Sequence, residues 1–236
     1  MREEIRLIEV KEGILAENEQ EAERLRFYLR AKGVFLLNLM ASPGAGKTSL
    51  IVQTIHALAT RLRIGVIEAD IDSSVDAETV SRTGVGAVQL RTGGFCHLDA
   101  GMVARGVEAL DVDNLDLIIV ENVGNLVCPA EFDTGAHASA MILSVPEGDD
   151  KPLKYPLMFT KCRALVVNKI DALGLFDFDI QLLRERAGQL NPQLKLFPLS
   201  CKSGEGVQGW IDWLEEEIRY QKTSEVSKKQ VLEGPS

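Results

Sequence analysis

The stretch VFLLNLMASPGAGKT (residues 34–48) places an apolar run directly before a glycine-rich loop. The run has the length of a strand buried on both faces, and the residues after Lys47 show helical spacing of apolar side chains. The loop nearly matches the phosphate-binding pattern G-x-x-x-x-G-K-[ST], with Ala41 in the place of the first glycine. Alanine tolerates a negative φ at that position, so this stretch predicts a strand, a phosphate loop and a helix.

Six further apolar runs follow, separated by segments with helical spacing. These runs cover residues 64–69, 86–90, 115–120, 140–145, 164–168 and 194–200. Such an alternation predicts an α/β fold of the phosphate-loop NTPase type, with a mainly parallel sheet of about seven strands and helices on both faces. In this architecture the functional loops follow the carboxyl ends of the strands.

We expect three regions along the chain. Residues 1–32 form an N-terminal helical extension, in which Leu25, Tyr28 and Leu29 share one face. Residues 33–222 form the nucleotide-binding domain with inserted metal-binding loops. Residues 223–236 form a polar tail that we expect to be disordered.

Composition limits the function classes. The net charge of −9 disfavours a nucleic-acid or anionic-membrane partner. No run reaches 18 apolar residues, and the first residues, MREEIRLIEV, lack the features of a signal peptide, which favours a cytoplasmic location. In that compartment the four cysteines are expected to be thiols or metal ligands rather than a disulfide framework.

The phosphate loop supplies donors for an anion. Gly44 and Gly46 let backbone N–H groups approach phosphate oxygens, and the helix N-terminus adds its own donors. Lys47 is expected to reach the β- and γ-phosphates, and the Thr48 hydroxyl to ligate Mg²⁺. The expected phosphate-binding residues are Gly44, Ala45, Gly46, Lys47, Thr48 and Ser49.

The tetrapeptide NKID (168–171) follows the run ALVVN and indicates the base. Asp171 can accept the N1–H and 2-amino protons of guanine, which adenine does not offer, so GTP is preferred over ATP. Asn168 is expected to brace the loop, and the stem of Lys169 to cover the base. The loop Ser200, Cys201 and Lys202 after the next run is expected to cap the base through backbone N–H groups, although an ordinary turn would look the same.

Acidic residues beside the phosphate loop are candidates for Mg²⁺ and for orienting water. Asp70 ends the second run and Glu121 ends the fourth, so these two carboxylates, with Thr48, form the expected magnesium set. Asp76 is a weaker candidate, and Asp72 reads better as a solvated loop residue. The candidate catalytic set is Lys47, Asp70, Asp76 and Glu121. No Gln or His stands at an obvious water-activating position, so we expect slow hydrolysis.

Cys96 and His97 lie in GGFCHLDAGM, and Cys128 lies in ENVGNLVCPAEFD. Two thiolates and an imidazole suit Zn²⁺ or Ni²⁺, provided that Cys96 and His97 lie at a turn or helix end. We expect them at the start of a helix, which would favour the Cys96 thiolate. Buried cysteines without a ligand remain the alternative, and that is our interpretation of Cys162 and Cys201. His56 and His137 are expected at the surface.

The motifs SPGAGKT, TGGFCHLDAGMV, ENVGNLVCPAEFD, SVPEGDDKPLKYP, NKID and SGEGVQGWIDWL occur in the order seen in the hydrogenase nickel-insertion GTPases, and the chain resembles that SIMIBI-class family over residues 34–215. The resemblance implies a GTPase that delivers nickel to maturing [NiFe] hydrogenase and uses Cys96, His97 and Cys128 as metal ligands. It also implies a homodimer, a small zinc-binding accessory partner and, directly or indirectly, the hydrogenase large subunit. The extra N-terminal CxxCGC or histidine-rich nickel sites of many relatives are not in this sequence.

The order of the motifs also suggests a coupling. Cys128 follows Glu121 on a segment that includes Gly124, whose N–H is placed to meet a γ-phosphate. GTP binding and hydrolysis are therefore hypothesised to shift Cys128 relative to Cys96 and His97, changing metal affinity or dimer geometry.

Three alternative functions can each be distinguished by a feature of the sequence or by an assay. A urease-type nickel chaperone carries Cys-Pro-His, whereas Cys128-Pro129 is followed here by Ala130. A small-molecule or nucleotide kinase is disfavoured by NKID. A non-catalytic metal-binding module, stabilised by nucleotide, would show no GTP turnover.

Overall fold

The computed structural model describes residues 10–70 and 75–233, with the side chains of residues 10–12, 75–77 and 224–233 outside that description. The seven predicted strands are all present, in the order β3-β2-β4-β1-β5-β6-β7, and every neighbouring pair is parallel. The strands are β1 (Phe35–Ala41), β2 (Ile64–Asp70), β3 (Gly86–Arg91), β4 (Leu117–Glu121), β5 (Ala138–Ser144), β6 (Ala164–Asn168) and β7 (Lys195–Pro198). This sheet confirms the predicted fold class.

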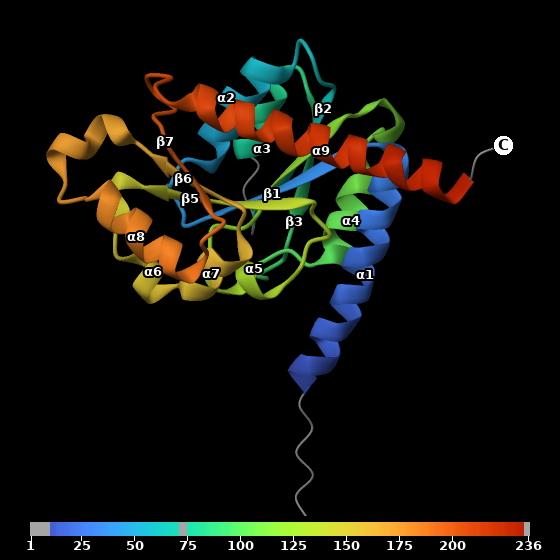
Figure 1. Cartoon of the computed structure of the whole chain (residues 1–236), viewed down its shortest axis with the longest axis horizontal. Helices are drawn as coiled ribbons and strands as arrows, with labels where there is room; N and C mark the ends of the chain where they lie inside the picture. Colours follow the sequence, from blue (N-terminus) through green and yellow to red (C-terminus); the bar gives the residue numbers. More distant parts are fainter. Residues whose placement is uncertain (1–9, 71–74, 234–236) are drawn as a thin grey trace, which may run out of the picture.

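One face of the sheet is covered by α2 (Lys47–Leu58), α3 (Val75–Ser81) and α9 (Val207–Glu233), as Figure 1 shows. Its core includes Leu37 and Leu39 of β1, Leu50 of α2 and Trp210 of α9, all fully buried. Because successive side chains of a strand point to opposite faces, the alternate residues Leu36, Asn38 and Met40 of β1 face the second helical layer.

The second face carries the remaining helices, in two groups. The first group is α1 (Val10–Lys32) and α4 (Ala100–Glu108); the second is α5 (Cys128–Glu131), α6 (Lys151–Lys154), α7 (Pro156–Lys161) and α8 (Ile180–Leu190). Three 3₁₀ turns, η1 (Val112–Asn114), η2 (Val145–Glu147) and η3 (Ile170–Leu175), complete the described elements. Leu36 packs in the core of the first group and Met40 in that of the second. Asn38 lies between them on β1, so a buried polar side chain separates two apolar clusters.

Within the N-terminal extension, α1 is helical from Val10 to Lys32, and its first turns project away from the sheet (Figure 1), while residues 1–9 lie outside the described residues. Leu25 and Leu29 are buried against the sheet, whereas Tyr28 is partly exposed. None of the helices in the described ranges is both long and apolar enough to cross a bilayer.

Two expectations were wrong. Residues 223–233 of the predicted tail are not irregular, because α9 continues through Glu233, while residues 234–236 lie outside the described residues. Residues 223–233 contain Glu, Lys, Gln and Leu, which favour helix and extend one that tertiary packing has already started. His137 is not a surface residue, because its ring stacks on Phe35 with centroids 5.3 Å apart and accepts a hydrogen bond from the Leu36 N–H at 2.9 Å.

Candidate functional site: a phosphate loop joined to a thiol–imidazole cluster

The phosphate loop lies at the carboxyl end of β1, the central strand of the sheet. Gly44 and Gly46 have φ of 76° and 106°, in the left-handed region that favours glycine. A side chain at Gly44 would meet open space, so the loop leaves room for a group beside its backbone. Helix α2 begins at Lys47 with Gly46 as its cap, and Ser49 is exposed in the first turn. This loop has the geometry that a phosphate group requires.

Lys47, Thr48 and Glu121 meet beside this loop. The Lys47 Nζ lies 3.8 Å from a carboxylate oxygen of Glu121, and both side chains are almost fully buried. The Thr48 hydroxyl donates to both oxygens of Glu121, at 3.2 and 3.3 Å. Because β4 pairs directly with β1, its last residue reaches the phosphate loop. A hydroxyl and a carboxylate at this distance fit the oxygen ligands that Mg²⁺ prefers.

Asp70 stands farther from this cluster than Glu121 does. Asp70 ends β2, which pairs with β4 and β3 and not with β1, so it is one strand more distant from the loop than Glu121 is. Asp72 lies outside the described residues. Asp76 lies in α3, but its side chain is outside the description.

The NKID loop packs directly on the phosphate loop. The Asn168 amide donates to the Ala45 carbonyl at 3.0 Å, while its oxygen accepts from the Lys169 N–H at 2.8 Å and the Cys201 N–H at 3.1 Å. The Lys169 Nζ donates to the Gly44 carbonyl at 2.7 Å. Asn168 therefore ties together the two loops that the sequence assigns to phosphate and base.

The side of the site predicted to read the base contains Asp171 and the loop after β7. The Ser200 hydroxyl donates to Asp171 at 2.6 Å, and this hydrogen bond is the main reason that the pKa of the Asp171 carboxyl is lowered. Asp171 is exposed, while Ser200 is buried beneath it and Lys202 is exposed beside it. The Cys201 side chain packs against the core, as predicted, and burial raises its pKa to about 11. An ionised, exposed Asp171 is in the state that an acceptor of guanine protons needs.

Cys96, His97 and Cys128 come together as one cluster, with one ligand atom from each within 4.8 Å of the others. The Cys96 and Cys128 sulfurs are 2.8 Å apart, and the His97 Nδ1 lies 3.8 Å from the Cys96 sulfur. The His97 ring stacks on Phe132 with centroids 3.9 Å apart. All three side chains are half-buried, so the cluster can receive a cation from one side.

Cys96 and His97 do not begin a helix, which corrects the prediction. Helix α4 begins at Ala100, capped by Asp99, whose carboxylate accepts from the Met102 N–H at 2.7 Å. The pKa of Cys96 is raised, first by its hydrogen bond with Cys128 and then by burial. Burial also lowers the pKa of His97 and outweighs the opposite effect of Asp99 and Glu131. A neutral imidazole is the form that binds metal.

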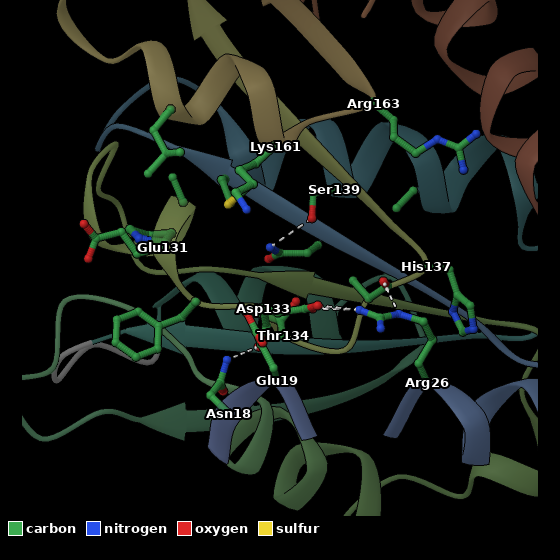
Figure 2. A pocket seen from close by; sticks show the side chains of 18 of the residues that line it. Asn18, Glu19, Arg26, Glu131, Asp133, Thr134, His137, Ser139, Lys161 and Arg163 are labelled. Carbon is green, nitrogen blue, oxygen red and sulfur yellow. Dashed lines mark hydrogen bonds and ion pairs between the residues drawn. The ribbon is translucent and has the colours of Figure 1, made fainter. Parts of the chain in front are cut away.

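A cavity of about 670 Å³ is lined in part by residues 129–132, which follow Cys128 directly. Figure 2 shows its walls, with Arg26 and Asn18 of α1 joined to Asp133 and with Lys161 reaching in from α7. Arg163 points away and pairs with Glu217 of α9 at 2.7 Å. Glu131 and Phe132 line this cavity, and Phe132 also stacks on His97, so the cavity adjoins the thiol–imidazole cluster.

Some contacts were not predicted from the sequence. Asn122 and Asn125, on the segment between Glu121 and Cys128, bond to the backbone of the Cys96 segment. The Ser42 hydroxyl donates to Glu147, which bonds in turn to Ser144. Two asparagines in ENVGN were the available signal, since a buried carboxamide needs partners.

Comparison with known proteins gives consistent matches. Residues 35–198 match the family model described as CobW/HypB/UreG, nucleotide-binding domain. The hydrogenase maturation factor HypB of Rhizobium leguminosarum bv. viciae is 45% identical over 210 residues, which span 89% of this chain and 70% of that protein. HypB of Escherichia coli K12 is 42% identical, over 89% of this chain and 72% of that protein.

Solved structures agree. HypB from Helicobacter pylori in complex with nickel superposes with a TM-score of 0.83 at 34% identity, covering 87% of this chain and 97% of that one. HypB from Archaeoglobus fulgidus superposes with a TM-score of 0.81 at 37% identity, covering 86% of this chain and all of that one.

Proposed function

Because the chain belongs to the CobW/HypB/UreG family of phosphate-loop GTPases, we propose that it is a nickel metallochaperone that uses GTP during [NiFe] hydrogenase maturation. The observation that carries the proposal is the continuity of two sites. The segment 121–128 begins at Glu121 beside the phosphate loop and ends at Cys128 in the thiol–imidazole cluster.

GTP binding is assigned to the two loops that Asn168 joins. Backbone N–H groups of the loop from Gly44 to Thr48 receive the phosphates, with Lys47 at the β- and γ-phosphates. Asp171 accepts the guanine protons, and Lys169 and the loop from Ser200 to Lys202 enclose the base. Mg²⁺, when bound, supplies a positive charge at the phosphates, and Thr48 and Glu121 would hold it, with Asp70 contributing through water.

We infer slow hydrolysis. Glu121 is engaged with Lys47 and Thr48, so it is placed to orient the cation rather than to take a proton from water. Asp76 remains the weaker candidate for orienting water. A slow reaction suits a protein whose two nucleotide states hold different conformations.

Nickel is the proposed cargo, held by Cys96, His97 and Cys128. Two thiolates and an imidazole suit Ni²⁺ and also Zn²⁺. Three ligands leave a coordination position for water or for a group from a second subunit, which supports a homodimer formed around the metal. The thiols must stay reduced for this purpose, which supports work in a reducing compartment such as the cytoplasm.

The proposed partners are a small zinc-binding accessory protein and the hydrogenase large subunit. Their support is the name of the relatives, which are hydrogenase maturation factors. A urease-type chaperone is not favoured, because Ala130 stands where that type has a histidine ligand.

The proposal is tested by measuring GTP turnover and nickel affinity on one preparation. We expect GTP turnover in the wild type that Lys47→Ala abolishes, and nickel affinity that differs between GDP and a non-hydrolysable GTP analogue. Phosphate release no higher than that of Lys47→Ala would refute GTPase function. Equal nickel affinity and equal dimerisation in the two nucleotide states would refute the coupling.

A further inference from the structure

The segment from Glu121 to Cys128 contacts both functional sites along its length. At its start, Glu121 bonds to Thr48 of the phosphate loop's helix. At Gly124 the backbone lies so close to Pro43 that an added side-chain carbon would be 3.0 Å from the proline ring. At its end, Cys128 lies 2.8 Å from Cys96, sulfur to sulfur. A change at the phosphate loop therefore acts on a segment that ends at a metal ligand.

Two asparagine side chains attach this segment to the other metal-binding segment. The Asn125 amide donates to the Cys96 carbonyl at 3.3 Å, and its oxygen accepts from the Val127 N–H at 3.0 Å. The Asn122 oxygen accepts from the Leu98 N–H at 3.2 Å. The bonds to Cys96 and Leu98 link residues that are far apart in sequence, so neither of these two follows from local chain geometry.

His97 contacts the chain just beyond this segment by ring stacking rather than by a hydrogen bond. Its ring stacks on Phe132, which follows α5 directly. Each residue from Cys96 to Leu98 thus has its own contact with the chain between Asn122 and Phe132. The three proposed metal ligands therefore form one connected unit. Within it, Asn125 bonds to the carbonyl of Cys96 itself and to the N–H of Val127, the residue before Cys128.

We propose that Asn125 is a positioning residue of the metal site, tying the backbone of Cys96 to the segment that carries Cys128 so that the two sulfurs keep their relative placement when that segment moves. The inference rests on the proposed function for the identity of the cargo. It replaces the hypothesis that nucleotide state shifts Cys128 relative to Cys96 and His97. The connected unit moves as a whole, and nucleotide state then alters how the site is presented to a second subunit or partner.

The residue type matters because one carboxamide serves two roles. The oxygen closes a turn onto Val127, and the nitrogen reaches across to Cys96. A serine at this position keeps an acceptor for the turn but has no donor long enough to reach Cys96. Alanine removes both interactions.

Asn191 is a matched control in the same chain. Its oxygen accepts from the Gln193 N–H at 3.1 Å, and its amide donates to the Phe159 and Cys162 carbonyls at 3.2 and 2.9 Å. Like Asn125, it closes a local turn with its oxygen and bonds with its amide to the backbone of a segment distant in sequence. It joins the ends of α7 and α8, however, away from the proposed metal ligands. Asn191→Ala reports the general cost of losing such a bridge.

The experiment compares Asn125→Ala, Asn125→Ser and Asn191→Ala with the full-length wild type, first without nucleotide. Ni²⁺ affinity is measured by competition with a chromophoric chelator, and the thiolate-to-nickel charge-transfer absorption reports the ligand geometry. Far-UV circular dichroism and GDP affinity verify folding. We expect both Asn125 variants to bind Ni²⁺ about tenfold more weakly, with an altered charge-transfer spectrum and unchanged GDP affinity. Asn191→Ala should keep the wild-type affinity and spectrum.

Wild-type nickel affinity and spectrum in a folded Asn125→Ser protein would overturn the proposal, and so would an equal loss in Asn191→Ala. Should Asn125→Ala not fold, Asn125→Ser alone decides, because it keeps the turn. A different measurement refutes the proposed function, namely the absence of GTP turnover in the wild type. That result would not affect the comparison of nickel binding, which is made without nucleotide.

Discussion

Gly46→Ala should damage the protein far more than Gly44→Ala, although both glycines have left-handed backbone in the same loop. At Gly46 the added carbon would lie 2.3 Å from the Asn168 amide nitrogen, so the carboxamide has to move. Asn168 makes three hydrogen bonds there, to Ala45, Lys169 and Cys201. At Gly44 the same carbon would meet no atom within 4 Å.

The two costs can be separated. A left-handed alanine costs about 1–2 kcal/mol at either position. Displacing Asn168 breaks three hydrogen bonds, one buried and two partly buried, each contributing about 1 kcal/mol net. Gly46→Ala is therefore expected to lower the free energy of unfolding by about 4–5 kcal/mol, and Gly44→Ala by about 1–2 kcal/mol.

Urea unfolding of nucleotide-free protein, followed by circular dichroism, measures this difference. The absence of nucleotide matters because a side chain at Gly44 would also obstruct the phosphates. Asn168→Ala provides a further check, since adding it to Gly46→Ala should cost little more once the carboxamide has already been displaced. Equal destabilisation by the two glycine substitutions would refute the idea that Asn168 braces the phosphate loop.

Three other predictions concern the half-buried His137, recognition of the guanine base, and the metal. Burial, and to a lesser degree Arg30 and Arg26, lower the pKa of His137 to about 3, so its neutral form stabilises the fold above pH 6.5 and that stability is lost as the pH falls from 6.5 towards 3. His137→Asn keeps an acceptor for the Leu36 N–H without titrating, and the wild type should lose about 2.5 kcal/mol more than this variant between pH 7 and pH 4.5 in metal-free urea unfolding; identical pH dependence would contradict the assignment. Asp171→Asn should weaken GTP binding by at least about tenfold and strengthen xanthosine triphosphate binding in a fluorescence titration, because the amide can donate to the 2-oxo group; an unchanged preference for guanine would place the base elsewhere. Cys128→Ala should lose bound Ni²⁺ by mass spectrometry of the native protein while GDP affinity stays unchanged, and retained metal would remove Cys128 from the ligand set.

The sheet was predictable because burial on both faces leaves a plain signal. The segments LIIV (117–120) and ALVV (164–167) are apolar at every position, and each lies in an interior strand of the sheet. Glycines and the N-K-x-D spacing indicated the two proposed nucleotide loops for a similar reason, since few residue types can adopt those conformations or make those contacts. The sequence also indicated the three residues, Cys96, His97 and Cys128, that the fold brings together as the proposed metal ligands.

The placement of those ligands was less predictable, because it depends on contacts between distant segments. Asp99 caps α4, so Cys96 and His97 lie in the loop before the helix. The glycines before Cys96 did not indicate that the helix would begin after His97. His137 was misjudged because a lone histidine between small residues carries no burial signal. Residues 223–233 were misjudged because composition alone does not show that α9 already supplies a helix to extend.

Asn38 has a consequence for how the molecule opens. It interrupts the apolar surface of β1 on one face, so α1 and α4 are held by one cluster and α5, α7 and α8 by another. Each group can separate from the sheet without exposing the core of the other. Amide protons of the two groups should therefore exchange with solvent as separate cooperative units with different protection, and the boundary between them should fall at the central strand rather than at a loop.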